Sequence, residues 1–331
     1  MTNHKVTIVT GGAGFIGSHM VDLLIDKGHK VHVIDNLQGG RESNIAHHLN
    51  NPKFSFTNID IRELDNKDPI FKNAKYVCHF AGIGDIVPSI ENPLDYIDVN
   101  LNGTIKVLEC SRYAGVEKFV YAASSSCYGI AEVPTSEKHK IQPEYPYALS
   151  KYLGEQAAFH WNKVYGIPVN SIRIFNAYGT RSRTSGAYGA VFGVFLRQKI
   201  ENKPLTVVGD GSQRRDFLYV TDVASAFLAA LETEMTGEIW NLGASNPQSV
   251  NKIVELLDSE VTYIPKRPGE PECTFADTTK IRDELNWEDK VSFEDGVKNL
   301  LRNIDYWKNA PLWTPDTIAI ATKSWFKYLD E

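Results

Sequence analysis

The sequence predicts an α/β protein with a doubly wound parallel sheet of the Rossmann type and a smaller mixed α/β lobe. Strand-like runs of Val, Ile, Phe and Tyr alternate with helical patterns up to about residue 175. Several of these runs are apolar throughout, which is typical of parallel strands covered on both faces. A glycine-rich turn joins the first run to the first helical pattern, as in dinucleotide-binding folds.

The first strand is expected at Val6–Thr10. The helix after it, at 15–27, should end at Gly28, because glycine favours helix C-termini. The later strands are expected at Val31–Asp35, Phe54–Asn58, Tyr76–Phe80, Phe119–Ser124 and Asn170–Phe175. The remaining helices of this half are expected at 62–72, 94–113 and 147–165. Such alternation predicts right-handed βαβ units.

The strand–helix rhythm breaks after about residue 176, where a glycine-rich loop and shorter elements follow. A helix at 221–232 is expected to return to the sheet. We therefore expect residues 1–176, together with 205–235, to form the Rossmann domain. Residues 177–204 and 236–331 should form the smaller lobe.

Composition excludes several classes of function. The formal net charge of −6 argues against nucleic acid or an anionic membrane surface as the main partner. None of the four cysteines forms a CxxC pair or lies at metal-ligand spacing from a histidine, so we expect no metal site and no disulfide framework. A reducing, cytoplasmic location fits this pattern. No signal peptide and no run of 18 apolar residues is visible.

The turn after the first strand contains Gly12-x-Gly14-x-x-Gly17, preceded by Gly11. Glycines there let the backbone approach a pyrophosphate at the N-terminus of a helix. Asp35 ends the second expected strand, where a carboxylate binds an adenosine ribose and repels a 2′-phosphate. The pattern predicts NAD rather than NADP as cofactor. Arg41 is a weaker argument for NADP.

Further motifs run through almost the whole chain. They include TGGAGFIGSH, DNLQGG, HFAG, SIENP, VNLNGT, ASSSCYG, YALSK, RIFNAYG, GDGSQRRDFLYVTDVA and RPGEP. In this order they resemble the extended short-chain dehydrogenase/reductases of the nucleotide-sugar epimerase and dehydratase family, closest in motif to UDP-glucose and UDP-N-acetylglucosamine 4-epimerases. The resemblance implies NAD contacts at Gly11, Gly14, Phe15, Ile16, Gly17, Asp35, Asn36, Asp60, Ile61, Phe80, Ala81, Gly82, Asn100, Tyr147, Lys151 and Phe175.

Tyr147 and Lys151 form a YxxxK pattern, which occurs once in the chain. Chance alone predicts about one such pair, so the pattern gains meaning from its place after the serine-rich end of the fifth strand. Tyrosine has an ordinary pKa near 10, about three units too high for a base at neutral pH. We expect the Lys151 ammonium, one helical turn away, to lower that pKa together with the positively charged nicotinamide. By the resemblance, Lys151 also holds the nicotinamide ribose, and Ser124 bonds the reacting oxygen.

The residues after Ser124 suggest which reaction occurs. Dehydratases of the resembling family carry an Asp-Glu pair there, and the decarboxylases a glutamate, whereas this chain has Ser125, Ser126 and Cys127. Without an acid, we expect oxidation at C4 and return of the hydride to the other face, which is C4 epimerisation. A UDP-glucuronate 4-epimerase, a 4,6-dehydratase, a reductase and a non-catalytic dinucleotide sensor remain alternatives.

The resemblance also implies a nucleotide-sugar site in the smaller lobe. Asn176, Arg215 and Arg267 match the family's diphosphate clamp, and a guanidinium can bond two phosphate oxygens at once. Glu270 matches a contact to the nucleotide ribose, and backbone groups near Leu205–Val207 are expected to contact the base. UDP is the expected nucleotide.

Sugar specificity is expected to depend on Gly84, Ser124, Ser125, Ser126 and Thr274. In the family, a tyrosine at the position of Thr274 excludes an acetamido group. Thr274 and Gly84 are small, so we expect both UDP-glucose and UDP-N-acetylglucosamine to be accepted. Arg181, Arg183 and Asp85 depart from the family pattern and leave the sugar open. Arg181 and Arg183 could contact a phosphate or a uronate, or simply form a charged loop.

A homodimer is expected as well. The helices at 94–113 and 147–165 carry apolar residues beyond one core face, namely Leu101, Ile105 and Leu108 on the first and Leu153, Ala157 and Trp161 on the second. In the resembling family these two helices pair with their copies. The alternative is that both apolar faces merely cover the sheet.

Overall fold

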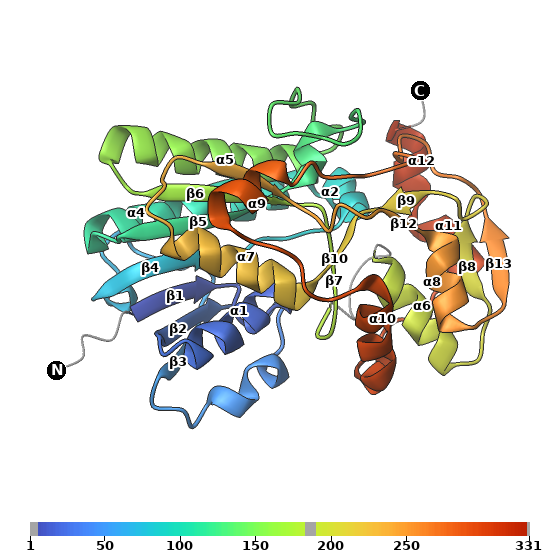
Figure 1. The fold of residues 1–331 in the computed structure, drawn as a ribbon, viewed down its shortest axis with the longest axis horizontal. Coiled ribbons are helices and arrows are strands. Elements are labelled where there is room, and N and C mark those ends of the chain that lie inside the picture. Colours follow the sequence, from blue (N-terminus) through green and yellow to red (C-terminus); the bar gives the residue numbers. More distant parts are fainter. Residues whose placement is uncertain (1–5, 183–189, 330–331) are drawn as a thin grey trace.

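The computed structural model describes residues 6–182 and 190–329. Its centre is a seven-stranded parallel sheet with the order β11-β6-β5-β4-β1-β2-β3 (Figure 1). The strands are β1 (Val6–Thr10), β2 (Lys30–Asp35), β3 (Phe54–Asn58), β4 (Ala74–His79), β5 (Lys118–Ser124), β6 (Val169–Ile174) and β11 (Ile239–Leu242). The doubly wound Rossmann-type fold is thus confirmed. The strand order reverses between β1 and β4, which places a ligand crevice at their carboxyl ends.

Helices cover both faces of this sheet. Helices α1 (Phe15–Asp26) and α7 (Val220–Glu232) pack on one face, where Met20, Leu24 and Phe227 are fully buried. Helices α4 (Thr104–Ala114) and α5 (Pro146–Tyr165) pack on the other through Val107, Leu108 and Ala158. The apolar side of each of these helices is therefore buried against one face of the sheet.

Two expected helices differ from the structure. The segment 62–72 holds two 3₁₀ turns, η3 (Ile61–Glu63) and η4 (Pro69–Phe71), because Asp60 and Asp68 each accept an amide two residues on and Pro69 disfavours helix before it. The helix expected at 94–113 is α3 (Pro93–Ile97) joined to α4 by a π-helical segment, η5 (Asp98–Gly103). Further short helices of this half are η1 (Glu42–Asn44), η2 (Ala46–His48), α2 (Ile86–Glu91) and η6 (Ser125–Tyr128).

The smaller lobe has its own core, which includes Phe192, Phe195, Ile253 and Trp307. Its helices are α6 (Val191–Ile200), α8 (Val250–Leu257), α10 (Phe293–Arg302), η7 (Ile304–Trp307), α11 (Pro315–Ala321) and α12 (Lys323–Leu329). Helix α9 (Thr279–Leu285), expected in this lobe, instead packs against β11 of the large sheet through the buried Ile281. Three two-stranded sheets pair β7 (Asn176–Tyr178) with β10 (Phe217–Tyr219), β9 (Arg214–Arg215) with β12 (Gln248–Ser249), and β8 (Leu205–Val208) with β13 (Val261–Ile264).

Two strands lie outside the half to which the sequence had assigned them. The expected segment 205–235 begins with β8, yet β8 pairs with β13 and packs in the core of the smaller lobe. Conversely, β11 lies beyond residue 236 but forms the seventh strand of the large sheet beside β6. Short apolar runs carry no information about which sheet they join, because that choice depends on long-range pairing.

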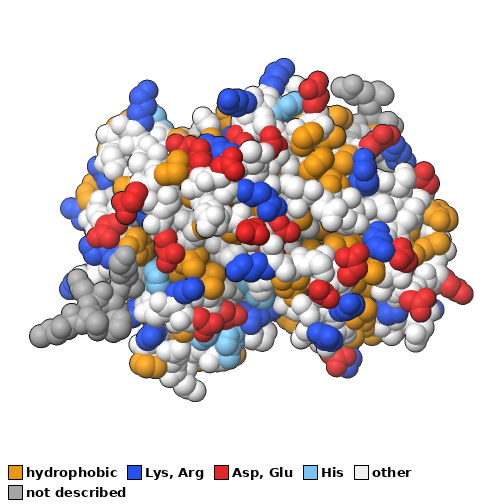
Figure 2. Space-filling model, viewed as in Figure 1, with side chains coloured by type: hydrophobic (Ala, Val, Ile, Leu, Met, Phe, Trp, Pro, Cys, Tyr) orange, Lys and Arg blue, Asp and Glu red, His pale blue; other side chains and the backbone are white. Residues whose placement is uncertain are grey.

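Charged side chains of both signs occur on the surface of the molecule. On the face seen in Figure 2, Lys and Arg side chains are interspersed with Asp and Glu side chains. Among the described residues, no helix is both long enough and apolar enough to cross a lipid bilayer.

Candidate active site

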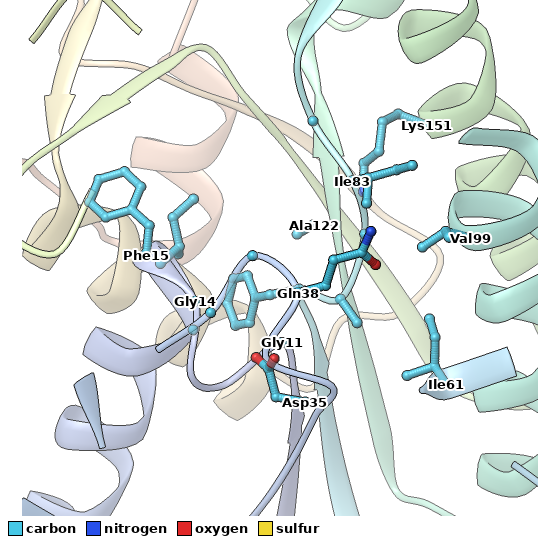
Figure 3. Close-up of a pocket in the computed structure, with 18 of the residues that line it drawn as sticks. Gly11, Gly14, Phe15, Asp35, Gln38, Ile61, Ile83, Val99, Ala122 and Lys151 are labelled. Carbon is cyan, nitrogen blue, oxygen red and sulfur yellow. The ribbon is translucent and has the colours of Figure 1, made fainter. Parts of the chain in front are cut away.

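A cavity of about 700 Å³ lies at the carboxyl ends of β1, β2, β4 and β5, where the strand order reverses. Figure 3 shows Gly11, Gly14 and Asp35 at one end of this cavity and Lys151 towards the other. The expected site residues that line it are Gly11, Gly14, Phe15, Ile16, Gly17, Asp35, Asn36, Asp60, Ile61, Phe80, Ala81, Gly82, Gly84, Ser124, Tyr147, Lys151 and Phe175.

The glycine turn is packed too closely for side chains. A Cβ on Gly17 would lie 2.2 Å from the Gly11 carbonyl oxygen, and one on Gly11 would lie 2.7 Å from the Ala81 amide nitrogen. Gly11 also has a φ of +69°, in the left-handed region that glycine favours. The turn therefore presents bare backbone at the start of α1, which suits a pyrophosphate.

Two carboxylates lie near the carboxyl ends of β2 and β3, at the same end of the cavity as the glycine turn. Asp35 accepts hydrogen bonds from the Ala13 and Leu37 amides at 3.0 and 2.8 Å, and its burial raises its pKa. Asp60 accepts from the Arg62 guanidinium at 2.8 Å, which lowers its pKa to about 2. Asn36 donates to Asp60 at 2.9 Å and ties the two strand ends together. The donor and acceptor set at this end fits a ribose.

Arg41, which could have bound the 2′-phosphate of NADP, turns towards the smaller lobe. Its guanidinium carbon lies 5.1 Å from the centre of the Tyr306 ring.

The expected catalytic side chains meet at the sheet end of the cavity. Ser124 ends β5, Tyr147 lies in the first turn of α5, and Lys151 follows one turn later. The Ser124 hydroxyl is hydrogen-bonded to Tyr147, and its oxygen lies 2.8 Å from the Ser126 hydroxyl oxygen. The end of β5 and the start of α5 therefore bring the Ser124 and Tyr147 hydroxyls together.

Burial acts on the pKa values of both α5 residues. Removal of water from Lys151 lowers its pKa to about 8, although the carboxylate of Glu155 acts in the opposite direction. The pKa of Tyr147 is raised by burial, and the bond from Ser124 offsets this in part. Burial is the largest influence on the pKa of Tyr147 within the chain itself, and the lowering expected from Lys151 together with nicotinamide stays a prediction. The Lys151 ammonium lies 4.6 Å from the centre of the Tyr121 ring.

Asn100 lies behind the cavity wall instead of lining it. Its side chain accepts from the Ile83 amide at 2.8 Å and donates to the Ile83 carbonyl at 3.0 Å and to Ser150 at 2.9 Å. The π-helical segment η5 turns this residue inward, and Asn100 fixes the loop that carries Gly82 and Gly84. Ser125 and Ser126 also lie outside the lining, on η6.

The expected nucleotide-sugar residues form two groups next to the cavity. In the first, the Thr274 hydroxyl donates to the Asn176 amide oxygen at 2.7 Å. In the second, Glu270 accepts from Arg215 at 2.7 Å and has Arg267 at 4.0 Å. These contacts bring together residues that are up to 98 positions apart in the chain. The backbone of β8, expected near the base, is partly engaged, since the Thr206 amide donates to Gln198 at 3.1 Å.

Sequence reasoning missed a buried polar chain behind the catalytic helix. Glu155, one turn after Lys151, binds Arg173 of β6 at 2.6 Å. Arg173 donates to the Tyr128 hydroxyl at 2.8 Å, and Tyr128 donates to Asn241 of β11 at 2.7 Å. The i, i+4 spacing of Lys151 and Glu155 was a visible signal, but the partner on β6 was not.

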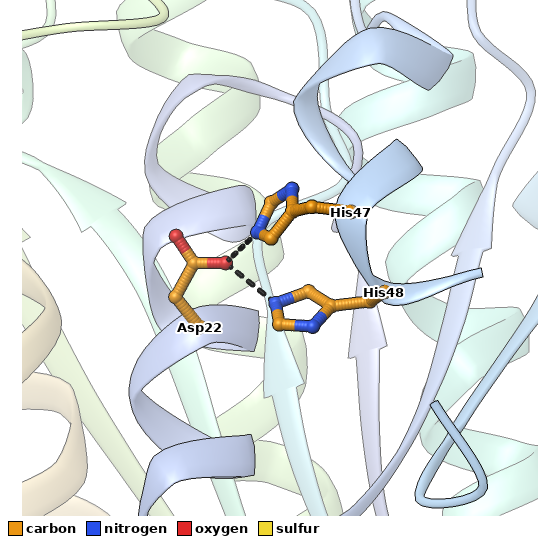
Figure 4. A group of neighbouring side chains, drawn as sticks. All are labelled: Asp22, His47 and His48. Carbon is orange, nitrogen blue, oxygen red and sulfur yellow. Dashed lines mark hydrogen bonds and ion pairs between the residues drawn. The ribbon is translucent and has the colours of Figure 1, made fainter. Parts of the chain in front are cut away.

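A second missed group lies on the outer side of α1. Figure 4 shows Asp22 receiving two imidazoles, with His47 and His48 nitrogens at 2.8 and 2.7 Å from the same carboxylate oxygen. Their donor atoms lie within 4.8 Å of one another, close enough to hold a metal ion. The other Asp22 oxygen binds Arg181 at 2.8 Å, and this cation beside the carboxylate opposes a metal ion. Arg183 lies outside the described residues.

Comparison with known proteins identifies the family. The model of the NAD-dependent epimerase/dehydratase family matches residues 7–243. The chain belongs to this family. Its cofactor is NAD, and the glycine turn, Asp35 and the cavity beside them fit that group.

The relatives that are similar to the chain are named for different sugar substrates. A UDP-glucuronate 4-epimerase of Thermodesulfobacterium geofontis is 34% identical over 306 residues, which are 88% of this chain and 93% of the relative. The structure of a UDP-N-acetylglucosamine 4-epimerase from Methanobrevibacter ruminantium is 30% identical, with a TM-score of 0.83 over 91% of this chain and 99% of that one. The UDP-glucose 4-epimerase of Thermotoga maritima is 32% identical, with a TM-score of 0.82 over 92% and 98%. Other relatives are named as UDP-glucuronic acid decarboxylases and a dTDP-glucose 4,6-dehydratase.

Proposed function

We propose that the protein is an NAD-dependent C4 epimerase of UDP-hexoses, acting on UDP-glucose and UDP-galactose and on the corresponding N-acetylhexosamines. One observation carries the proposal. Ser124, Tyr147 and Lys151 meet in the cavity, and the segment that follows Ser124 is Ser125, Ser126 and Cys127, without a carboxylic acid. Elimination of water or loss of carbon dioxide needs further acid–base groups, whereas epimerisation at one carbon needs one base and a hydride acceptor.

The proposed roles follow from position. Tyr147 takes the proton of the C4 hydroxyl as the C4–H bond breaks, and gives it back when the bond re-forms on the other face. NAD, held by the glycine turn, Asp35 and Lys151, would supply a hydride acceptor at C4 that is regenerated in each cycle. Lys151 is the charged neighbour that stabilises the Tyr147 phenolate, and Ser124 bonds the reacting oxygen. Burial raises the pKa of Tyr147, so a phenolate near neutral pH requires a positive charge close to the hydroxyl.

The nucleotide is proposed to bind across the two groups of the smaller lobe. Arg215 and Arg267 face one carboxylate, Glu270, at 2.7 and 4.0 Å, and an entering diphosphate gives both guanidiniums a new partner. Glu270 is then left to bond the nucleotide ribose. Asn176 is held in place by Thr274 and completes the clamp.

A uronic acid fits this arrangement less well than a neutral hexose. Arg181, one candidate for a sugar carboxylate, forms an ion pair with Asp22 and does not line the cavity. UDP-glucuronate is therefore the second candidate substrate, supported by the glucuronate 4-epimerase among the relatives.

The test is turnover followed by proton NMR, with UDP-glucose, UDP-N-acetylglucosamine and UDP-glucuronate in parallel and no added cofactor. We expect the C4 epimers of the first two substrates and no net formation of NADH. A product that forms only when stoichiometric NADH is added would identify a reductase, and a 4-keto-6-deoxy product would identify a dehydratase. No turnover of any nucleotide sugar would favour a non-catalytic dinucleotide sensor.

We also propose that the protein is a cytoplasmic homodimer that pairs through α4 and α5. Of the apolar residues named above, Leu108 and Ala157 are buried in the core and do not reach the outer face. Tyr113, Leu149, Val164 and Tyr165 of these helices are 41–53% exposed and offer apolar surface for a partner copy. Light scattering at micromolar concentration should give the dimer mass, and a monomer mass would overturn the dimer.

A further inference from the structure

The C-terminal helix α12 packs against the loop that carries Arg267. This loop, residues 265–271, is called the nucleotide loop below. The Trp325 indole N–H donates to the Pro268 carbonyl at 2.7 Å, and Trp325 is only 6% exposed. At Gly269, which has a φ of +66°, an added Cβ would lie 3.8 Å from the Leu329 carbonyl oxygen. Helix α12 therefore covers the nucleotide loop from Pro268 to Gly269.

Trp325 also contacts the Arg267 guanidinium directly. The guanidinium carbon lies 5.5 Å from the centre of the Trp325 ring, within the range of a cation–π interaction. The Arg267 side chain is 12% exposed although it lies on a loop. The indole thus fixes both the backbone of the nucleotide loop and the charged group at its start.

The same helix reaches the other side of the site. The Ser324 hydroxyl donates to Glu91 at 2.8 Å, and Glu91 ends α2. Helix α2 begins directly after Gly84 and Asp85, which line the cavity, and it packs against α5. Figure 1 shows α12 close to the C-terminus, at the top of the smaller lobe. Helix α12 therefore connects the nucleotide loop with α2, the helix that begins after the cavity residues Gly84 and Asp85.

The nucleotide loop needs such support for a physical reason. It lies between the end of β13 at Ile264 and the start of α9 at Thr279, and this stretch contains no helix or named strand. A guanidinium on an unsupported loop must be ordered when the ligand binds, which costs conformational entropy. An aromatic ring that orders the guanidinium in advance reduces this cost.

We propose that Trp325 is a positioning residue for nucleotide-sugar binding, and that α12 is a strap that holds Arg267 ready for the diphosphate. This inference rests on the proposed function, since it takes the Arg267 ligand to be the diphosphate of a UDP-sugar. The inference assigns a role in binding to Trp325, which is not one of the expected diphosphate contacts and lies among the last ten residues described.

The experiment measures UDP and uridine binding to the purified holoenzyme by calorimetry. In Trp325→Leu, which keeps apolar volume but loses the π face and the N–H, we expect the Kd for UDP to rise about tenfold, equivalent to about 1.4 kcal/mol. Trp325→Phe keeps a ring beside Arg267 and should fall between the wild type and Trp325→Leu. Tyr328→Ala is the matched control, because Tyr328 lies on the same helix and is 60% exposed.

Three readouts separate positioning from a general structural role. Uridine has no phosphate, so its Kd should stay the same in Trp325→Leu. In an Arg267→Ala background, Trp325→Leu should add less than a twofold change to the UDP Kd, because the group that it positions is gone. With UDP-glucose as substrate, KM should rise while kcat and the NAD content stay at wild-type levels.

Other outcomes would overturn the proposal. Equal weakening of UDP and uridine, or additive effects of the two substitutions, would show that Trp325 only stabilises the lobe. An unchanged UDP Kd in Trp325→Leu would remove α12 from nucleotide binding. A wild-type chain that binds NAD but no UDP would contradict the proposed function itself, and the positioning role with it.

Discussion

The part of the cavity that holds Ser124, Tyr147 and Lys151, with the Glu155–Arg173 pair behind it, is called the floor below. The floor and the nucleotide loop are built in opposite ways. At the floor, Glu155 and Arg173 form an ion pair at 2.6 Å whose side chains are 1% and 4% exposed, and the pair joins α5 to β6. At the nucleotide loop, Arg215 and Glu270 form a pair at 2.7 Å whose side chains are 13% and 20% exposed. The two distances are nearly equal, whereas the surroundings differ.

The difference in exposure between the two ion pairs matches the different roles proposed for them, which are to hold the catalytic side chains and to bind the nucleotide. A buried pair cannot exchange its partner for water or ligand without a large desolvation cost, so it fixes the frame that holds Lys151. A partly exposed pair exchanges partners at little cost, which suits guanidiniums that must release a carboxylate for a diphosphate. Four predictions test this comparison, beginning with the one that has the largest expected effect.

Replacing Tyr147 by Phe removes the proposed base from the floor. We expect turnover of UDP-glucose to fall by about 10²–10⁴-fold, the range for loss of a general acid–base group. The thermal unfolding midpoint should stay close to that of the wild type. Tyr145→Phe is the matched control, because Tyr145 stacks on Tyr147 at 6.4 Å between ring centres. Near-wild-type turnover in Tyr147→Phe would contradict the mechanism.

Removing one carboxylate from each region compares the two pairs directly. Glu155→Ala leaves the Arg173 charge buried, so the free energy of unfolding should fall by about 3–5 kcal/mol. Glu270→Ala leaves Arg215 near solvent, and the loss should stay within about 1 kcal/mol. Urea denaturation of both variants gives the comparison. Equal losses would show that burial does not distinguish the two regions.

Thr274→Tyr tests the room beside the sugar. We expect turnover of UDP-N-acetylglucosamine to fall by about 10–200-fold relative to UDP-glucose, the usual scale of steric discrimination in a pocket. The substitution also removes the Thr274 bond to Asn176, so Thr274→Val serves as the control that loses the bond without filling space. Equal losses on the two substrates in Thr274→Tyr would remove this position from sugar selection.

The smallest effect expected is on pH dependence. The pKa of Lys151 is lowered to about 8, so the side chain is charged below that pH and neutral above it. Tyr121, Glu155 and the neutral His79, whose pKa is lowered to about 3, face it from β5, α5 and β4. Activity should therefore decline above about pH 8, by up to tenfold per pH unit.

Lys151→Arg keeps the positive charge at alkaline pH, because arginine stays protonated in proteins. Its overall rate should be lower, since the guanidinium is larger, but the decline above pH 8 should disappear. A pH–rate profile of both enzymes decides the matter. The same alkaline decline in Lys151→Arg would assign it to another group.

The sequence predicted the floor better than the loop. Gly11, Asp35 and Ser124 lie at the carboxyl ends of strands whose apolar runs are visible in the sequence, and parallel strands bring these ends to one edge. The motifs then indicated which side chains to expect there. For the same reason, most of the expected NAD residues line the cavity.

The remaining features depend on contacts between distant segments. Nothing near Trp325 indicates that its indole reaches Pro268, 57 positions away, and nothing near Glu155 indicates Arg173 on another element. The assignment of β8 and β11 to the wrong halves has the same origin. Asn100 was expected in the cavity because of its motif, and the π-helical turn places it behind the wall.

The most direct test of the central claim uses UDP-glucose labelled with deuterium at C4, incubated with the purified protein and followed by NMR and mass spectrometry. Oxidation and reduction at one carbon with a bound hydride acceptor predicts UDP-galactose that retains the deuterium at C4, with no exchange into solvent and no accumulation of NADH. Deuterium found at another carbon or in water, or a product lacking the C4 hydroxyl, would contradict it.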